Sequence, residues 1–160
     1  MKWFVKCIRN YVNFEGRARR SEYWYFCLFS ILFLLVALLL DYLLFGTGRR
    51  VLYSLLVLFL FLPQTAVMIR RLHDIGRSGK IVLWYYLLFF LWIVALLVTG
   101  TSSFFGMMSG ASTDAAPVGF LAVMSLGGLA YFVWGIFFLV WFCTAGTPGD
   151  NKYGPDPKAE

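Results

Sequence analysis

Four long apolar stretches constrain this chain more than any other feature of its sequence. They cover about residues 23–44, 51–69, 81–98 and 118–142 of the 160 residues. A run of about 20 apolar residues crosses the roughly 30 Å hydrocarbon core of a bilayer as a helix. Only 14% of the residues are charged, whereas about 25% are charged in soluble domains. We therefore expect an all-α integral membrane protein with four transmembrane helices, organised as a single membrane domain over residues 1–160.

The residues before the first span predict a separate short helix. On a helical projection of residues 1–14 the polar side chains gather on one narrow side, and apolar side chains fill the remainder. These polar residues are Lys2, Lys6, Arg9, Asn10 and Asn13. Such an amphipathic helix lies in the headgroup layer, or it packs on the cytoplasmic surface of the protein itself. Gly16 then permits a bend, and Ser21 is a candidate N-cap for the first span.

The distribution of lysine and arginine predicts the orientation in the membrane. The N-terminal segment holds six, the first loop two, the second loop four, the third loop none and the tail, residues 143–160, two. A cytoplasmic N-terminus places twelve basic residues inside and two outside. Because basic residues are concentrated in cytoplasmic loops, we expect both termini and the second loop to be cytoplasmic.

The net charge of +6 indicates a lipid partner rather than a nucleic acid. Most basic residues lie within a few positions of a span, where each gains about 1 kcal/mol from anionic lipid. Most aromatic side chains lie inside the apolar runs, so few are free to stack on bases. We expect anionic membrane lipids as partners and no nucleic acid.

The sequence does not favour an enzyme, a metal site or a cofactor. Its three cysteines are scattered, and it has a single histidine, which does not fit a Cys/His metal site. His73 and Asp74 are adjacent, which usually prevents their side chains from making the base–orienter contact of a triad. We therefore expect a non-catalytic protein without a cofactor.

The spans contain few polar groups. These are Ser30, Ser54, Gln64, Thr65 and Ser125, with Asp41 near an outer end. Ionisable residues near the bilayer midplane usually mark a transport path, and these spans have none there, so an ion relay is not supported. A subunit of a small-molecule transporter or channel is kept as the alternative function. Pro63 predicts a helix kink, and Gln64 and Thr65 could bond a neighbouring span or the loosened backbone. Residues 99–117, rich in Gly, Ser, Thr and Ala with one charge at Asp114, predict an outer loop.

Three charged motifs fall on the predicted cytoplasmic side. They are "GRARRSEYW" (16–24), "RRLHDIGRSGK" (70–80) and "GTPGDNKYGPDP" (146–157). Taken singly, they are explained as a basic anchor, a hairpin turn and a turn-rich tail. Together they hold enough arginine to require carboxylate partners, and Glu22 and Asp74 are available for bidentate pairs. We expect the three motifs to form one ordered polar cluster.

The leading functional hypothesis is an interaction module at this cluster. Backbone amides of the Gly/Ser turn and the nearby arginines would make an anion cradle. The ligand would be an anionic headgroup or a partner protein, and a homo-oligomer is also open. The candidate binding residues are Arg17, Arg20, Glu22, Arg70, Arg71, His73, Asp74, Arg77, Ser78, Asn151 and Tyr153.

The same motifs carry a family resemblance. "FEGRARRSEYWYF" (14–26), "RRLHDIGRSG" (70–79) and "GDNKYGPDP" (149–157), in this order around four apolar spans, resemble the YhaH-like family of small bacterial inner-membrane proteins. The resemblance implies a four-helix protein of the bacterial inner (plasma) membrane with no assigned reaction and no catalytic residues. The chain departs from the family at Lys80, where an aromatic is expected, and in residues 99–117, which have no counterpart.

Overall fold

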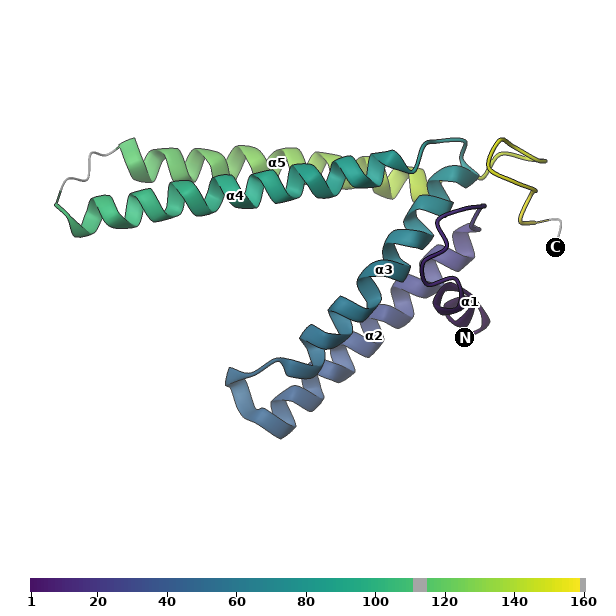
Figure 1. The fold of residues 1–160 in the computed structure, drawn as a ribbon, viewed down its shortest axis with the longest axis horizontal. Coiled ribbons are helices and arrows are strands. Elements are labelled where there is room, and N and C mark those ends of the chain that lie inside the picture. The colour runs from purple at the N-terminus through teal and green to yellow at the C-terminus, as the bar shows by residue number, and fades with distance from the viewer. Residues whose placement is uncertain (111–114, 159–160) are drawn as a thin grey trace. The chain divides into compact units, whose positions relative to one another are not determined.

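The structure is a computed structural model that describes residues 1–110 and 115–158. All of its long secondary-structure elements are helices (Figure 1). The helices are α1 (Lys2–Arg9), α2 (Arg20–Phe45), the short 3₁₀ helix η1 (Gly46–Gly48), α3 (Val51–Asp74), α4 (Lys80–Met108) and α5 (Ala115–Cys143). Four of these helices, α2, α3, α4 and α5, are long and apolar enough to cross a membrane. The predicted all-α class with four candidate spans is therefore confirmed.

The chain divides into two compact units. Residues 1–80 together with 141–158 form the first unit, and Ile81–Val140 forms the second. The first unit contains α1, the α2–α3 hairpin and the C-terminal tail, and the second contains most of the α4–α5 hairpin. The single membrane domain expected from the sequence stays a prediction.

Helices α2 and α3 pack side by side as an antiparallel hairpin (Figure 1). Near the connection through η1, Asp41 is 1% exposed, and its carboxylate accepts the backbone N–H groups of Leu52 and Tyr53 at 2.9 and 2.8 Å. These amides lie in the first turn of α3, where no intrahelical acceptor exists. Asp41, although it belongs to α2, therefore caps α3.

Helix α1 packs against α2 and α3. The ring of Phe4 lies 5.2 Å from the rings of both Phe26 and Phe33 on α2, and Cys7 is fully buried. The position of α1 relative to a membrane stays a prediction. The expected cap at Ser21 is wrong: α2 begins at Arg20, so Ser21 lies within the helix, and Arg19 occupies the N-cap position with no side-chain cap.

Pro63 lies within α3 and changes the hydrogen bonding around it. Proline has no N–H, so the carbonyl of Phe59, four residues earlier, loses its helical donor. The Tyr11 hydroxyl donates to that carbonyl at 2.6 Å. Thr65 instead donates to its own helix, at Phe61 O, and Gln64 contacts a neighbouring helix through the sulfur of Cys27. The expected kink stays a prediction.

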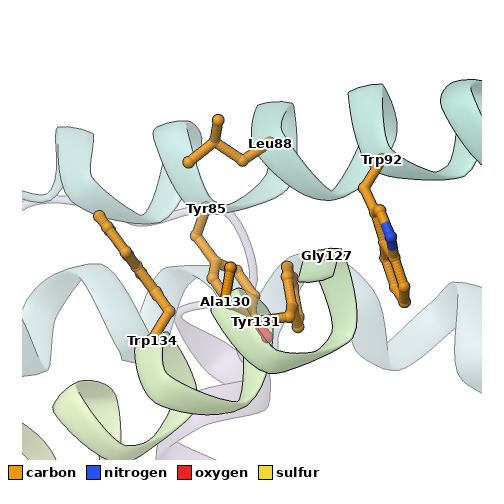
Figure 2. A pocket seen from close by; sticks show the side chains of 7 residues that line it. All are labelled: Tyr85, Leu88, Trp92, Gly127, Ala130, Tyr131 and Trp134. Carbon is orange, nitrogen blue, oxygen red and sulfur yellow. The ribbon is translucent and has the colours of Figure 1, made fainter. Parts of the chain in front are cut away.

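The α4–α5 hairpin is held by aromatic side chains. The indole of Trp92 on α4 donates to the carbonyl of Val123 on α5 at 3.0 Å. A Cβ atom at Gly127 would lie 2.0 Å from that indole nitrogen, so only glycine admits this approach. Figure 2 shows Trp92 with Tyr85 and Trp134 around a pocket of about 200 Å³ within this unit.

The outer loop expected from Thr99 begins later than predicted. Helix α4 continues to Met108, so residues 99–108 are helical. The hydroxyls of Thr99 and Thr101 donate to the carbonyls of Ala95 and Leu97, and this lets polar side chains lie in an apolar helix. Asp114 lies outside the described residues.

Candidate functional site

An ion pair joins the start of α2 to the end of α3. The guanidinium of Arg70, in the last turns of α3, donates to Glu22 Oε1 at 2.9 Å. Glu22 is completely buried and Arg70 is 3% exposed. Lys6 of α1 places its ammonium 3.5 Å from the other carboxylate oxygen. The backbone of Arg70 also accepts the N–H of Ala18 at 3.0 Å, which fastens the segment before α2 to the end of α3.

A second carboxylate pairs with two arginines. Asp74 Oδ1 lies 3.1 Å from Arg17 Nε and 3.0 Å from Nη2, so a single carboxylate oxygen faces two nitrogens of the guanidinium. Asp74 Oδ2 accepts from Arg71, one turn earlier on α3. All three side chains are buried. Charges held in such surroundings need partners, because the loss of water costs each ion several kcal/mol.

The same arginines hold the C-terminal tail. Arg17 donates to the carbonyls of Thr147 and Gly149, and Arg71 donates to the carbonyls of Phe142 and Thr144. Guanidinium has five donors in a planar fork, so one arginine can satisfy a carboxylate and two backbone oxygens at once. The tail is therefore fixed by buried charges that belong to distant parts of the sequence.

The third motif completes the cluster. The Asn151 amide donates to the backbone carbonyl of His73 at 3.0 Å. The rings of Tyr153 and His73 stack with 3.9 Å between centroids and 5° between planes. Gly146 touches the Asp74 carboxylate so closely that a Cβ atom there would lie 2.2 Å from Oδ2. We call these contacting residues of the three motifs the polar cluster.

The structure brings eight of the eleven predicted site residues into the polar cluster. They are Arg17, Glu22, Arg70, Arg71, His73, Asp74, Asn151 and Tyr153. The prediction that Glu22 and Asp74 pair with arginines within one ordered cluster is confirmed.

The other three predicted residues lie exposed at its edge. Arg20 Nη1 donates to the carbonyl of Cys143 at 3.1 Å, and the guanidinium of Arg77 lies over the ring of Trp141, 4.3 Å from its centroid. Ser78 Oγ accepts the backbone N–H of Lys80 at 3.3 Å, at the start of α4. Their binding role stays a prediction.

The chemistry of the polar cluster is that of a scaffold. Its carboxylates pair with its guanidiniums, and Arg17 and Arg71 also donate to backbone carbonyls, whereas Arg70 Nε and Nη2 have no hydrogen-bond partner among the described residues. Burial, followed by the negative charge of Glu22, raises the pKa of the Cys7 thiol to about 12. The thiolate is the nucleophilic form, so the raised pKa and the burial of Cys7 favour the less reactive thiol. Among the described residues no group of three or more His, Cys, Asp or Glu side chains could hold a metal ion.

Sequence reasoning missed several residues that build the site. Thr147 donates its backbone N–H to the carbonyl of Asp74 at 2.9 Å, and Gly146 allows the close approach just before it. Cys7 and Lys6 pack at Glu22. No sequence signal pointed to these residues. Outside the polar cluster, the contact of Tyr11 did have a signal, because Pro63 implies an unpaired carbonyl four residues earlier. Nothing in the sequence identifies Tyr11 as the donor to that carbonyl.

Four apolar helices, with a buried ion-pair cluster at one end of the α2–α3 hairpin, define a small multi-pass membrane protein. Residues 11–155 match the family described as "Protein of unknown function (DUF805)". The chain belongs to this family, which confirms the resemblance stated above.

Curated relatives agree with this assignment. The chain is 36% identical to "Inner membrane protein YhaH" of Escherichia coli K12, over 100% of this chain and 99% of that protein. It is 33% identical to "Inner membrane protein YhaI" of the same organism, over 99% and 97%. No solved structure matches the chain. The comparisons and the four apolar helices together make it a multi-pass inner-membrane protein.

Proposed function

We propose that the chain is a non-catalytic interaction module whose cytoplasmic end binds anionic lipid headgroups. The observation that carries this proposal is the division of its arginines. Arg17, Arg70 and Arg71 are buried and paired with carboxylates. Other basic side chains of the same region remain exposed around them. The buried arginines therefore hold the three motifs in position, and the exposed basic side chains bind the lipid headgroups.

The exposed set consists of Arg20, Arg77, Lys80 and Lys152, which we call the cationic rim. Two of its members are held in place by one contact each, to the Cys143 carbonyl and to the Trp141 ring. A guanidinium that is held in this way keeps donors for a phosphate oxygen and loses less side-chain entropy on binding. Each basic residue near an anionic surface contributes about 1 kcal/mol.

The proposal includes the orientation of the chain. The cationic rim faces the cytoplasm, and so do both termini. This orientation is supported by the twelve basic residues on that side against two, Arg49 and Arg50, on the other. The anionic phospholipids of the cytoplasmic leaflet then lie at the depth of the rim.

Native mass spectrometry of the gently purified protein, with the lipids that copurify, tests the proposal. The informative variant is Arg20→Gln/Arg77→Gln, because it removes two rim charges and leaves the buried ion pairs intact. The matched control is Arg49→Gln/Arg50→Gln, which removes two exposed charges at the other end of the hairpin. We expect the wild type and the control to retain anionic lipid and the rim variant to lose it. Equal retention by all three proteins would refute headgroup binding and favour a protein partner.

The alternative, a subunit of a small-molecule transporter or channel, has weaker support. Asp41 is an ionisable side chain inside a span, and it is engaged as the cap of α3. Flux measured across proteoliposomes, with empty liposomes as control, decides between this alternative and the interaction module.

A further inference from the structure

One hydroxyl in the spans differs from its counterparts. Those of Thr65, Thr99 and Ser125 donate to a carbonyl about one turn earlier in their own helices, at 2.7 to 3.2 Å. Ser30 on α2 is 7% exposed, yet among the described residues its Oγ has no hydrogen-bond partner. A hydroxyl kept from water without a partner costs free energy. Ser30 therefore indicates a partner from outside the chain.

Ser30 lines a pocket of about 370 Å³ between α2 and α3. The pocket has two further polar groups, Cys27 and Gln64. The Gln64 amide contacts the Cys27 sulfur at 3.6 Å, and that sulfur lies 4.0 Å from the amide oxygen. Both are long, weak contacts that leave most of the amide's hydrogen-bonding capacity unused. The remaining walls are apolar, formed by Ile31, Leu34, Val57, Leu60 and Phe61. Apolar walls with a few convergent polar groups are typical of small-molecule sites.

We propose that this pocket binds a neutral, lipid-soluble molecule through a carbonyl oxygen that accepts from the Ser30 hydroxyl and the Gln64 amide. The ligand is neutral because none of the described residues lining the pocket is charged. It offers an acceptor because the hydroxyl and the amide both have a proton to donate. An acyl chain alone would fill the volume and leave Ser30 unpaired. This proposal does not depend on the cationic rim.

The depth of the site narrows the ligand class further. Ser30 follows Glu22 by eight residues on α2, which corresponds to about 12 Å along the helix at 1.5 Å per residue. The pocket thus lies toward the hydrocarbon core from the polar cluster. Two lipid-soluble sources supply a carbonyl there, namely a quinone ring and the ester of a glycerolipid. Both offer a carbonyl oxygen as the hydrogen-bond acceptor, and they differ in how freely they dissolve in the hydrocarbon core of the bilayer.

Titration of the full-length protein in detergent micelles, followed by native mass spectrometry, tests the site. The two probes are decylubiquinone and monooleoylglycerol. We expect the wild type to bind one molecule of at least one probe. Ser30→Ala and Gln64→Leu each remove one hydrogen bond, so we expect binding about three- to tenfold weaker. The control Ser125→Ala, a hydroxyl bonded within its own helix, should bind as the wild type does.

The possible outcomes distinguish a quinone from a glycerolipid ester, and they also test whether the pocket binds such a ligand at all. Ser30-dependent binding of decylubiquinone alone supports a quinone, and Ser30-dependent binding of monooleoylglycerol supports a glycerolipid ester. Absence of binding for both probes overturns the proposal, and so does binding that neither Ser30→Ala nor Gln64→Leu weakens. Thermal unfolding of the empty variants is the fold control. Ser30→Ala should melt at or above the wild-type temperature, because it removes an unpaired buried hydroxyl.

Discussion

At the scale of single residues, Asp74 joins three parts of the chain through its side chain and its backbone. Its carboxylate pairs with Arg17, which precedes α2, and with Arg71 on α3. Its backbone carbonyl accepts both the N–H and the hydroxyl of Thr147 in the tail. Three segments far apart in sequence thus depend on one residue at the end of a helix.

The substitution Asp74→Asn keeps the shape of the side chain and removes its negative charge. The buried guanidiniums of Arg17 and Arg71 then have no counter-ion at this position. Breaking a buried pair from one side typically costs about 3–5 kcal/mol. We therefore expect a lower free energy of unfolding and a clearly lower melting temperature in detergent. Glu15→Gln, at an exposed position, is the control and should melt as the wild type does. A melting temperature unchanged by Asp74→Asn would contradict the structural role of the ion pairs.

At the scale of elements, the helices are joined where a backbone or side-chain group lacks a partner in its own helix. Pro63 leaves the Phe59 carbonyl free, and Tyr11 takes it. Asp41 of one helix caps the next. Gly127 leaves a space on α5 that Trp92 of α4 enters. Each contact sets how one helix lies on its neighbour.

The attachment of the N-terminal segment can be measured with a double-mutant cycle. Tyr11→Phe removes the hydrogen bond to Phe59 and should cost about 0.5–1.5 kcal/mol of unfolding free energy. Pro63→Ala restores the helical N–H donor to the same carbonyl, so Tyr11→Phe should cost less in that background. The coupling between the two positions is read from the four unfolding free energies. Strict additivity would show that Tyr11 does not compensate for Pro63.

The α4–α5 contact is tested by two adjacent glycines. Gly127→Ala would place a methyl group against the Trp92 indole, and overpacking of this kind costs about 1–3 kcal/mol. At Gly128 a Cβ atom would meet no described atom within 4 Å. We expect the first substitution to lower the melting temperature and the second to leave it unchanged or raised. Similar effects at both positions would show that the indole does not hold the hairpin.

At the scale of the whole molecule, charge differs between the two ends of the α2–α3 hairpin. The end formed by the start of α2 and the end of α3 carries the polar cluster and the cationic rim, whereas the end at η1 carries Arg49 and Arg50. This asymmetry is the physical basis of the proposed orientation, because basic segments are retained on the cytoplasmic side.

Cysteine labelling in intact cells tests the orientation. In a chain without its three native cysteines, Thr47→Cys should react with a membrane-impermeant maleimide, and Ser78→Cys should react only after the inner membrane is opened. Both positions are exposed in the structure, so a difference in labelling reports the side of the membrane. The reverse pattern would invert the orientation and place the cationic rim outside.

The membrane class and the four spans followed from the sequence alone. Long apolar runs have one stable solution in a bilayer, a helix that satisfies its own backbone. The pairing of Glu22 and Asp74 with arginine was also predictable, since buried charges of one sign require the other. Element ends were less predictable. Residues 99–108 continue α4 because their hydroxyls bond to its backbone, a local choice that composition does not reveal.

The partners of each charge were decided by tertiary structure. Nothing in the sequence distinguishes Arg17, Arg70 and Arg71, which are buried, from Arg20 and Arg77, which stay at the surface. The same holds for Ser30, whose hydroxyl has no partner in the described part of the chain, and for Tyr11, which reaches the carbonyl freed by Pro63. An apolar run belongs to one continuous segment of the chain, so it can be recognised directly in the sequence. A buried hydrogen bond depends on which side chains meet after the helices have packed.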